Sequence, residues 1–136
     1  DMTALSAPRL VSEKAGITST APVAAATTIF QGALVVMEGG VAKPGKTALS
    51  LVVLGIADET VDNSGGIAGA ARVTTRRGIF RFANLGSDAL TEADIGQDAY
   101  LVDDQTVAKT AATNTRSIAG KVIDVDAVGA WVRVGF

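Results

Sequence analysis

The sequence contains neither cysteine nor histidine. Without cysteine no disulfide or thiolate site can form, and without histidine any bound metal would need oxygen ligands. The absence of histidine also removes Ser-His-Asp and Cys-His activation of a nucleophile, and the side chain best suited to proton transfer near neutral pH. We therefore expect a protein that is not an enzyme and that holds no metal and no cofactor.

Positive charge is also scarce: 12 Lys and Arg stand against 14 Asp and Glu, giving a formal charge of −2 and a pI near 5.0. The basic residues are scattered, which argues against nucleic-acid binding through phosphate neutralisation. The sequence has no secretory signal pattern and no apolar run of about 18 residues, so we expect no membrane contact and synthesis in the cytosol. We take Met2 as the natural start and Asp1 as an added residue.

Aromatic residues are few, with four Phe, one Trp and one Tyr in 136 residues. The length predicts a single domain. Two of the Phe lie in residues 71–83, where apolar side chains alternate with arginines. This alternation predicts a β-hairpin that turns near Gly78, with one face in the core. We expect Phe80, Phe82 and Trp131 to build that core.

The first 27 residues are rich in Ala, Thr, Ser and Pro, and their apolar residues are too irregularly spaced for a helix or a strand. Scattered Leu, Ile and Val suggest a segment that becomes ordered against another surface. We therefore predict an extended arm over residues 1–27 and a β-domain over residues 28–136. A frayed terminus without function is the alternative interpretation.

The remaining segments predict short strands separated by turns. The expected strands are 33–38, ended by Gly39 and Gly40; 49–57, a central strand buried on both faces; 99–102 with its return 106–109; and the half-buried hairpin of 117–125 with 130–134. Thr91 is expected to cap a single helical turn. The sequence therefore predicts an all-β fold, a small barrel or sandwich with at most one short helix.

Residues 40–47 match the phosphate-loop pattern G-x-x-x-x-G-K-[ST], which would assign Lys46 and Thr47 to a nucleotide and its Mg²⁺. A phosphate loop leads into a helix, but the residues that follow here predict a strand. Pro44 also removes one of the backbone donors. We favour a hairpin connection with a Pro-Gly turn and keep a small nucleotide-binding protein as the alternative.

Three groups of carboxylates invite a calcium or glycosidase interpretation: Asp58, Glu59 and Asp62; Asp103 and Asp104; Asp124 and Asp126. None has diagnostic spacing, and aspartates at turns usually bond their own backbone. Tyr100 and Trp131 could stack on a sugar, which would make the chain a carbohydrate-binding module. As single aromatics within strands, they are more typical of a core or a subunit contact.

The order of these segments resembles the capsid decoration, or cement, proteins of tailed bacteriophages, including the head-stabilising type of lambda-like phages. The similar parts are the Ala/Thr/Pro-rich N-terminal segment, residues 53–58 (Val-Leu-Gly-Ile-Ala-Asp) and residues 78–82 (Gly-Ile-Phe-Arg-Phe). The closing segments, residues 118–122 (Ile-Ala-Gly-Lys-Val) and 131–134 (Trp-Val-Arg-Val), resemble a broader group of phage β-barrel cement proteins.

This resemblance implies a β-tulip-like variant of the small barrel and a non-enzymatic homotrimer. Such a trimer would be made in the bacterial cytoplasm and would bind the outside of an expanded capsid at three-fold and quasi-three-fold axes. Its partners would be the major capsid protein and its own copies. The arm would clamp neighbouring capsid subunits, and we predict that Arg9, Leu10, Val11 and Ile17 make these contacts.

Overall fold

The computed structural model describes residues 4, 6–10 and 16–136. Twelve strands follow one another along the chain: β1 (Thr18–Pro22), β2 (Thr27–Ile29), β3 (Leu34–Glu38), β4 (Val41–Pro44), β5 (Val52–Ala57), β6 (Val61–Asn63), β7 (Arg72–Arg76), β8 (Gly78–Asn84), β9 (Asp98–Leu101), β10 (Thr106–Ala108), β11 (Ile118–Val125) and β12 (Ala130–Val134). Two 3₁₀ turns, η1 (Gly86–Asp88) and η2 (Glu92–Asp94), are the helical elements of the described residues.

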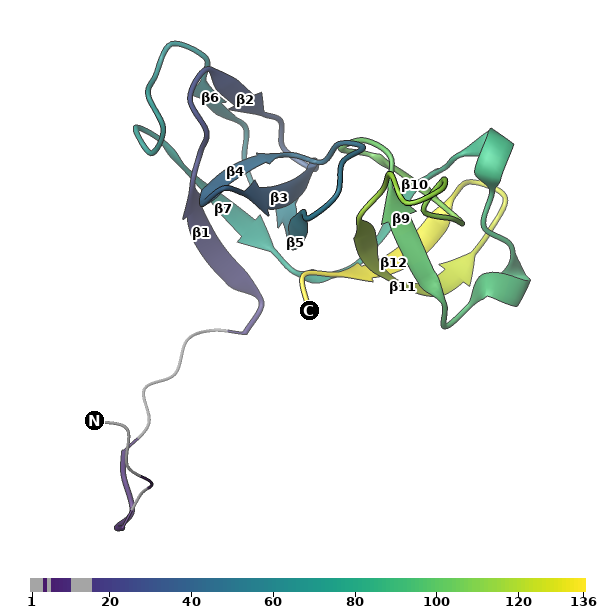
Figure 1. Cartoon of the computed structure of the whole chain (residues 1–136), viewed down its shortest axis with the longest axis horizontal. Coiled ribbons are helices and arrows are strands. Elements are labelled where there is room, and N and C mark those ends of the chain that lie inside the picture. The colour runs from purple at the N-terminus through teal and green to yellow at the C-terminus, as the bar shows by residue number, and fades with distance from the viewer. Residues whose placement is uncertain (1–3, 5, 11–15) are drawn as a thin grey trace.

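The strands form two main layers, seen side by side in Figure 1. One is a five-stranded antiparallel sheet in the order β1-β7-β5-β3-β4, and the other is a closed barrel in the order β10-β8-β12-β11-β9. Strands β2 and β6 form a separate pair beside the sheet. The predicted all-β barrel fold is therefore confirmed, with two short 3₁₀ turns instead of at most one helix.

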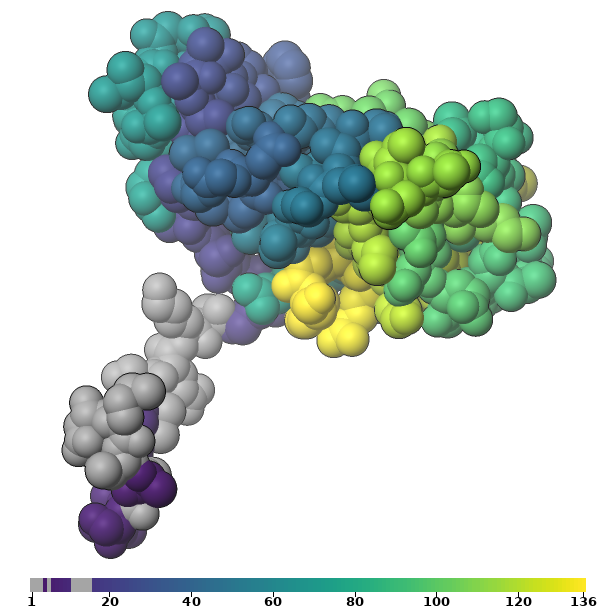
Figure 2. All heavy atoms as spheres, in the orientation of Figure 1, coloured from purple at the N-terminus to yellow at the C-terminus, as the bar shows by residue number. Residues whose placement is uncertain are grey.

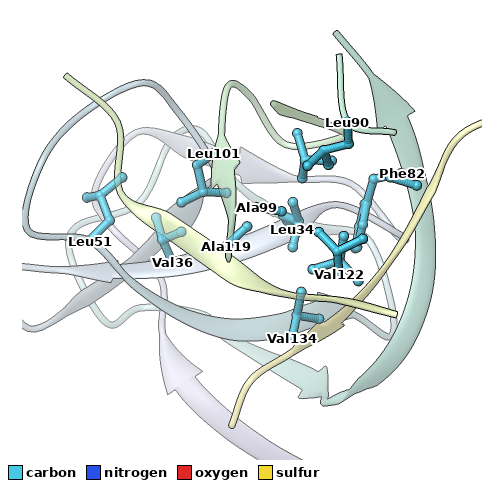
Figure 3. Packing of buried hydrophobic residues seen from close by; sticks show 13 residues of the cluster. Leu34, Val36, Leu51, Phe82, Leu90, Ala99, Leu101, Ala119, Val122 and Val134 are labelled. Carbon is cyan, nitrogen blue, oxygen red and sulfur yellow. The ribbon is translucent and has the colours of Figure 1, made fainter. Parts of the chain in front are cut away.

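Strand β3 joins the two layers because its side chains enter two different cores. Leu34 and Val36 pack with the barrel residues, whereas Val35 packs on the opposite face of the sheet. All three side chains are fully buried. Figure 3 shows Leu34 and Val36 among the labelled side chains of the barrel core. The barrel core therefore includes residues of the sheet, and the sheet has a second core on its other face.

The barrel core is made almost entirely of aliphatic side chains. Its buried members are Leu34, Val36, Leu51, Phe82, Leu90, Ala99, Leu101, Val107, Ala119, Val122, Ala130, Val132 and Val134. Phe82 belongs to this core as predicted, and Phe80 is half-buried against it. Trp131 does not belong to it. Alternation along β12 turns Val132 and Val134 inward, so Trp131 lies on the outer face.

Strand β5 occupies the centre of the sheet, as predicted, between β7 and β3. Gly55 has a φ of +142°, and a Cβ there would lie 2.3 Å from the Arg76 carbonyl oxygen, so the predicted close approach is confirmed. Burial on both faces was a wrong prediction, because Val52 is 63% exposed and Val53 is only half-buried. The apolar run of residues 49–57 therefore extends beyond the barrel core at its first residues.

The predicted hairpin over residues 71–83 is wrong. Strand β7 pairs with β1 and β5 in the sheet, whereas β8 pairs with β12 and β10 in the barrel. The chain therefore crosses from one layer to the other near Gly78 instead of folding back on itself. Alternation placed the strands correctly but carried no information about their partners.

The expected arm over residues 1–27 also needs correction, because the sheet begins at Thr18. Strand β1 pairs with β7 through five residue pairs, from Thr18 with Arg76 to Pro22 with Arg72. Ala21 and Val23 are buried in the second core of the sheet. Small and polar residues hid this edge strand, because an edge strand needs few large apolar side chains. The described residues before β1, which are residues 4, 6–10, 16 and 17, lie outside the strands.

Several local predictions are confirmed. Strands β3 and β4 form a hairpin across Gly39 and Gly40, whose φ angles of +61° and +84° suit a type I′ turn. Strands β9 with β10 and β11 with β12 pair as expected, with a bulge in β11. Thr91 caps the turn η2 through a capping box with Asp94.

Candidate partner-binding surface

The described residues before β1 are exposed. Every residue from 6 to 10 is exposed, Leu10 to 99%, and Figure 2 shows this segment apart from the body of the molecule. Of the predicted contact residues, Arg9 and Leu10 lie in this segment, Ile17 is 59% exposed at its junction with β1, and Val11 lies outside the described residues. An exposed backbone carrying apolar side chains is able to add to a strand edge of another molecule.

The junction between this segment and the sheet is fixed by one backbone hydrogen bond. The Arg77 N–H donates to the Ile17 carbonyl oxygen at 2.9 Å, directly after the last pair of β1 with β7. Position 17 is therefore held by the β7–β8 crossing, beside the start of β1 (Figure 1). We call residues 1–17 the arm from here on.

A second feature suited to extended chains is the first half of β8, because β10 pairs only with Ala83 and Asn84 of that strand. We call this half, which has no partner strand opposite β12 among the described residues, the open edge of β8. The Ala83 N–H donates to Gln105 on the side away from β12, and backbone groups alternate along a strand, so Ile79 and Arg81 also point to that side. A hollow of about 480 Å³, lined in part by Gly32 and Ile56, lies along this edge. The body therefore carries a strand edge able to receive an extended segment.

The phosphate-loop match at residues 40–47 does not form a phosphate loop. Residues 41–44 are strand β4, paired with β3, and β5 follows where a phosphate loop would require a helix. The Lys46 ammonium donates to a Glu38 carboxylate oxygen at 2.7 Å, and the Thr47 hydroxyl donates to the Val102 carbonyl oxygen at 2.7 Å. The two residues that would hold a nucleotide are thus engaged within the fold.

Glu38 is the acceptor for two lysines, Lys43 and Lys46, both at 2.7 Å. Hydrogen bonds from Lys43 and Lys46 lower the pKa of Glu38 from 4.5 to about 2, against a small opposing effect of desolvation. This half-buried cluster stabilises the β3–β4 hairpin in its charged form and leaves neither ammonium group unpaired.

The turn aspartates bond local backbone, as predicted. Asp62 accepts from the Ser64 N–H, Asp103 from the Gln105 N–H, and Asp126 from the N–H groups of Val128 and Gly129. The Asp126 pKa is lowered, first by the Trp131 indole N–H and then by these backbone donors. Over residues 4, 6–10 and 16–136, no three Asp or Glu side chains gather closely enough to hold a metal ion.

The two aromatics considered for sugar stacking do not form a free platform. The Arg81 guanidinium lies 5.5 Å from the centroid of the Trp131 ring, and the indole N–H donates to Asp126 at 2.9 Å. Tyr100 is half-buried in β9. A sugar face packs on an open aromatic ring, so neither residue offers the geometry that a carbohydrate site needs.

A cluster of arginines near the junction of the arm was not predicted from the sequence. Arg77 and Arg133 both stack on the Phe136 ring, at 5.6 Å and 4.0 Å from its centroid. Arg77 and Arg133 are far apart in the sequence, so the sequence gave no indication that their side chains lie close together. The available signal was the Arg-aromatic alternation in β8 and β12.

Comparisons with known proteins place no family on this chain: no family model, no curated protein and no solved structure matches it. In the part of the chain that the structure describes, no helix is long and apolar enough to cross a membrane. The exposed arm, the open edge of β8 and the arginine cluster are therefore the features of the molecule that bear on its function.

Proposed function

We propose that the chain is a non-enzymatic structural protein that binds the outside of an expanded bacteriophage capsid and stabilises the shell. In this proposal it acts as a homotrimer at three-fold and quasi-three-fold axes, and its arm binds the major capsid protein. It is made in the cytoplasm of the bacterial host and ends on the outer surface of the virion. The observation that carries the proposal is the arm, where Leu10 is 99% exposed.

The energetics of the arm favour a role in binding over a role in stability. Leu10 contributes no burial to the body, whereas its burial on a partner would be worth about 1.5–3 kcal/mol. Part of that gain would offset the entropy lost when an extended backbone becomes ordered. Linking three arms in one trimer raises the overall avidity by about 10²–10⁴-fold, because later contacts become intramolecular.

The test is a truncation that leaves the sheet intact. Removing residues 1–15 keeps Ile17 and β1, and so preserves the Arg77 hydrogen bond and the β1–β7 pairing. We expect the truncated protein to remain folded and trimeric but to lose cosedimentation with expanded, undecorated shells of the virus that encodes it. Wild-type binding by the truncated protein would overturn the role of the arm.

The arm could also bind the open edge of β8 in a neighbouring copy of the chain. The same experiment therefore has to measure the oligomeric state of the truncated protein. If the arm bound that edge in a neighbouring copy, truncation would convert trimers to monomers, as measured by analytical ultracentrifugation. We expect trimers to persist, because the proposed receptor of the arm is the capsid subunit. Monomers would assign the arm to the trimer itself.

A matched pair of point variants separates arm contacts from general surface effects. Leu10→Asp places a charge on the arm, and Ile67→Asp places the same charge on an apolar side chain that is 78% exposed in the loop after β6. We expect Leu10→Asp to weaken shell binding at least tenfold and Ile67→Asp to leave it unchanged. Equal losses would show that binding is not specific to the arm.

Neither alternative function gains support from the geometry. Strand β4 and the Glu38 ion pairs occupy the place of a phosphate loop, and the Arg81 guanidinium covers the Trp131 ring. The two alternatives are therefore not proposed for this chain.

A further inference from the structure

Four arginines meet aromatic rings around the β7–β8 crossing and the end of β12. Arg76 lies over Phe80, Arg81 over Trp131, and both Arg77 and Arg133 over Phe136. Each guanidinium lies within 5.6 Å of a ring centroid. Stacking of this kind holds the charged group in place and removes part of its hydration, which strengthens its attraction for an anion.

Two of the four interact with a carboxylate of the fold, and the other two form no ion pair among the described residues. Arg76 forms an ion pair with Asp58 at 3.2 Å, and the charge of Arg81 contributes to the lowered pKa of Asp126. Arg77 and Arg133 form no ion pair with any residue that the structure describes. The surface thus carries two stacked guanidinium groups whose charge is not neutralised by the fold.

The two unneutralised charges lie close together. Because both guanidinium groups stack on the Phe136 ring, they are within about 10 Å of each other, which is no more than one Debye length at 0.1 M salt. Like charges at this separation repel, and an anion placed between them relieves the repulsion. Gly135 permits the arrangement: its φ is +90°, and a Cβ there would lie 2.5 Å from the Arg77 Cβ.

Apolar surface accompanies the charges. Phe136 is 68% exposed and Ile118 is 50% exposed, and both line a hollow of about 310 Å³ together with Arg133 and Lys121. Asp98 also lines this hollow, and its ion pair with Lys121 at 2.9 Å means that these two residues together add little net charge. We call the surface formed by Arg77, Arg133, Phe136 and Ile118 the arginine face.

The arginine face adjoins the point where the arm leaves the body. The Arg77 N–H that donates to Ile17 belongs to the same residue whose guanidinium stacks on Phe136. Figures 1 and 2 show the C-terminal end of the chain on the same side of the body as the start of β1. A partner that holds the arm near its junction therefore faces this surface.

We propose that the arginine face binds a carboxylate-bearing protein surface on the same partner that holds the arm. The inference rests on the proposed function, and it adds the chemistry of the partner: Asp or Glu side chains beside an apolar residue that contacts Phe136. Guanidinium groups bind carboxylates in a bidentate geometry, which makes the contact directional as well as electrostatic. A nucleic acid is disfavoured, because two unneutralised arginines on a chain of net charge −2 form no continuous phosphate-binding stripe.

The first test measures binding to the undecorated shells as salt is varied. Arg77→Gln/Arg133→Gln removes the two charges, and Arg72→Gln/Lys109→Gln removes the same charge elsewhere. Arg72 makes only contacts of 3.4 Å with Thr20, and Lys109 lies 3.9 Å from Asp94. We expect the first variant to bind about tenfold more weakly at 50 mM NaCl, and the difference to shrink at 500 mM. Equal binding by the two variants would overturn the proposal.

The second test needs no shell. Polyglutamate is added to the full chain, and the Nε–H signals of Arg77, Arg133 and Arg72 are followed by NMR. We expect saturable shifts at Arg77 and Arg133 only, and none in the double variant Arg77→Gln/Arg133→Gln. Absence of these shifts, or equal shifts at Arg72, would overturn the assignment.

The two tests separate this inference from the proposed function. If the full chain fails to bind shells but polyglutamate shifts Arg77 and Arg133, the capsid role is wrong and the carboxylate-binding surface remains. If shells are bound, polyglutamate shifts neither arginine signal and the double variant binds as the control does, the proposed role of the arginine face is wrong and the role of the arm remains. A duplex oligonucleotide that binds more tightly than polyglutamate at equal charge concentration would overturn the choice of a protein partner.

Discussion

Leu10 and Leu34 are the same residue type in opposite settings: Leu10 is 99% exposed in the arm, and Leu34 is fully buried in β3. The body places its aliphatic side chains in two cores, while none of the described residues of the arm belongs to either. Burial of a leucine side chain is favourable wherever it occurs. The arm and the body therefore differ in which surface is available to bury their leucines. The body obtains this burial within one chain, whereas Leu10 stays exposed in the free chain and would gain it only on a second surface, as proposed above.

The largest predicted effect contrasts these two leucines directly. Leu34→Ala leaves a cavity where the sheet meets the barrel and should lower the free energy of unfolding by about 2–5 kcal/mol. Leu10→Ala should change it by less than about 0.5 kcal/mol, because no contact is lost in the free protein. Urea unfolding followed by circular dichroism measures both. A large loss in Leu10→Ala would show that the arm packs on its own body.

A smaller effect is expected at the polar link between the two layers of the body. The Ser117 hydroxyl donates to the Ala48 carbonyl oxygen at 2.7 Å and accepts from the Leu51 N–H at 3.1 Å. Ser117→Ala leaves both groups without their partner and should cost about 1–3 kcal/mol. The exposed Ser87 is the control, and Ser87→Ala should be nearly neutral in the same urea titration. Equal costs would mean that Ser117 does not link the layers.

A gain in stability is expected in the loop between β10 and β11. Ala112, Thr113 and Asn114 all have positive φ, between 50° and 59°. Thr113→Gly relieves this strain and should raise the free energy of unfolding by about 0.5–1 kcal/mol, after allowing for the entropy of glycine in the unfolded chain. Ala111→Gly changes a residue outside this group and should lower it. Thermal unfolding distinguishes the two signs, and a loss in Thr113→Gly contradicts the strained loop.

The smallest effect concerns the half-buried Glu38 cluster in the body. The pKa of Glu38 is about 2 in the folded chain against a reference value of 4.5, so the unfolded state binds more protons between these values. Its stabilising contribution is therefore complete above pH 4.5 and is lost as the pH falls toward 2. Carboxyl NMR titration should show the low pKa, and Lys43→Met/Lys46→Met should move it back toward 4.5. An unchanged pKa in that variant would contradict the two lysine contacts.

Local patterns predicted much of the fold. Gly39 and Gly40 marked a hairpin that forms, and alternation of Val132 and Val134 placed the inward face of β12 correctly. That same alternation places Trp131 outside, and the prediction of a core tryptophan gave its size more weight than its position. Information within a few residues was sufficient for these features.

Long-range pairing was the part that the sequence could not provide. Strands β7 and β8 are adjacent in sequence yet belong to different layers, because their partners β1 and β12 lie at opposite ends of the chain. The arginine face depends on the same kind of pairing, since Arg77 and Arg133 meet only when β12 lies against β8. The sequence did predict an N-terminal arm as a candidate binding segment. Where the arm ends became clear only from the pairing of β1 with β7 in the sheet.

Strand β1 also has a mechanical consequence. Its five residue pairs with β7 are bridged by hydrogen bonds roughly perpendicular to the strand. A tensile load applied to the arm along the axis of β1 would therefore act on these bonds in shear and load them together, instead of opening them one at a time. Strand β7 passes that load directly into β8, so the barrel shares the force from any attachment at the arm.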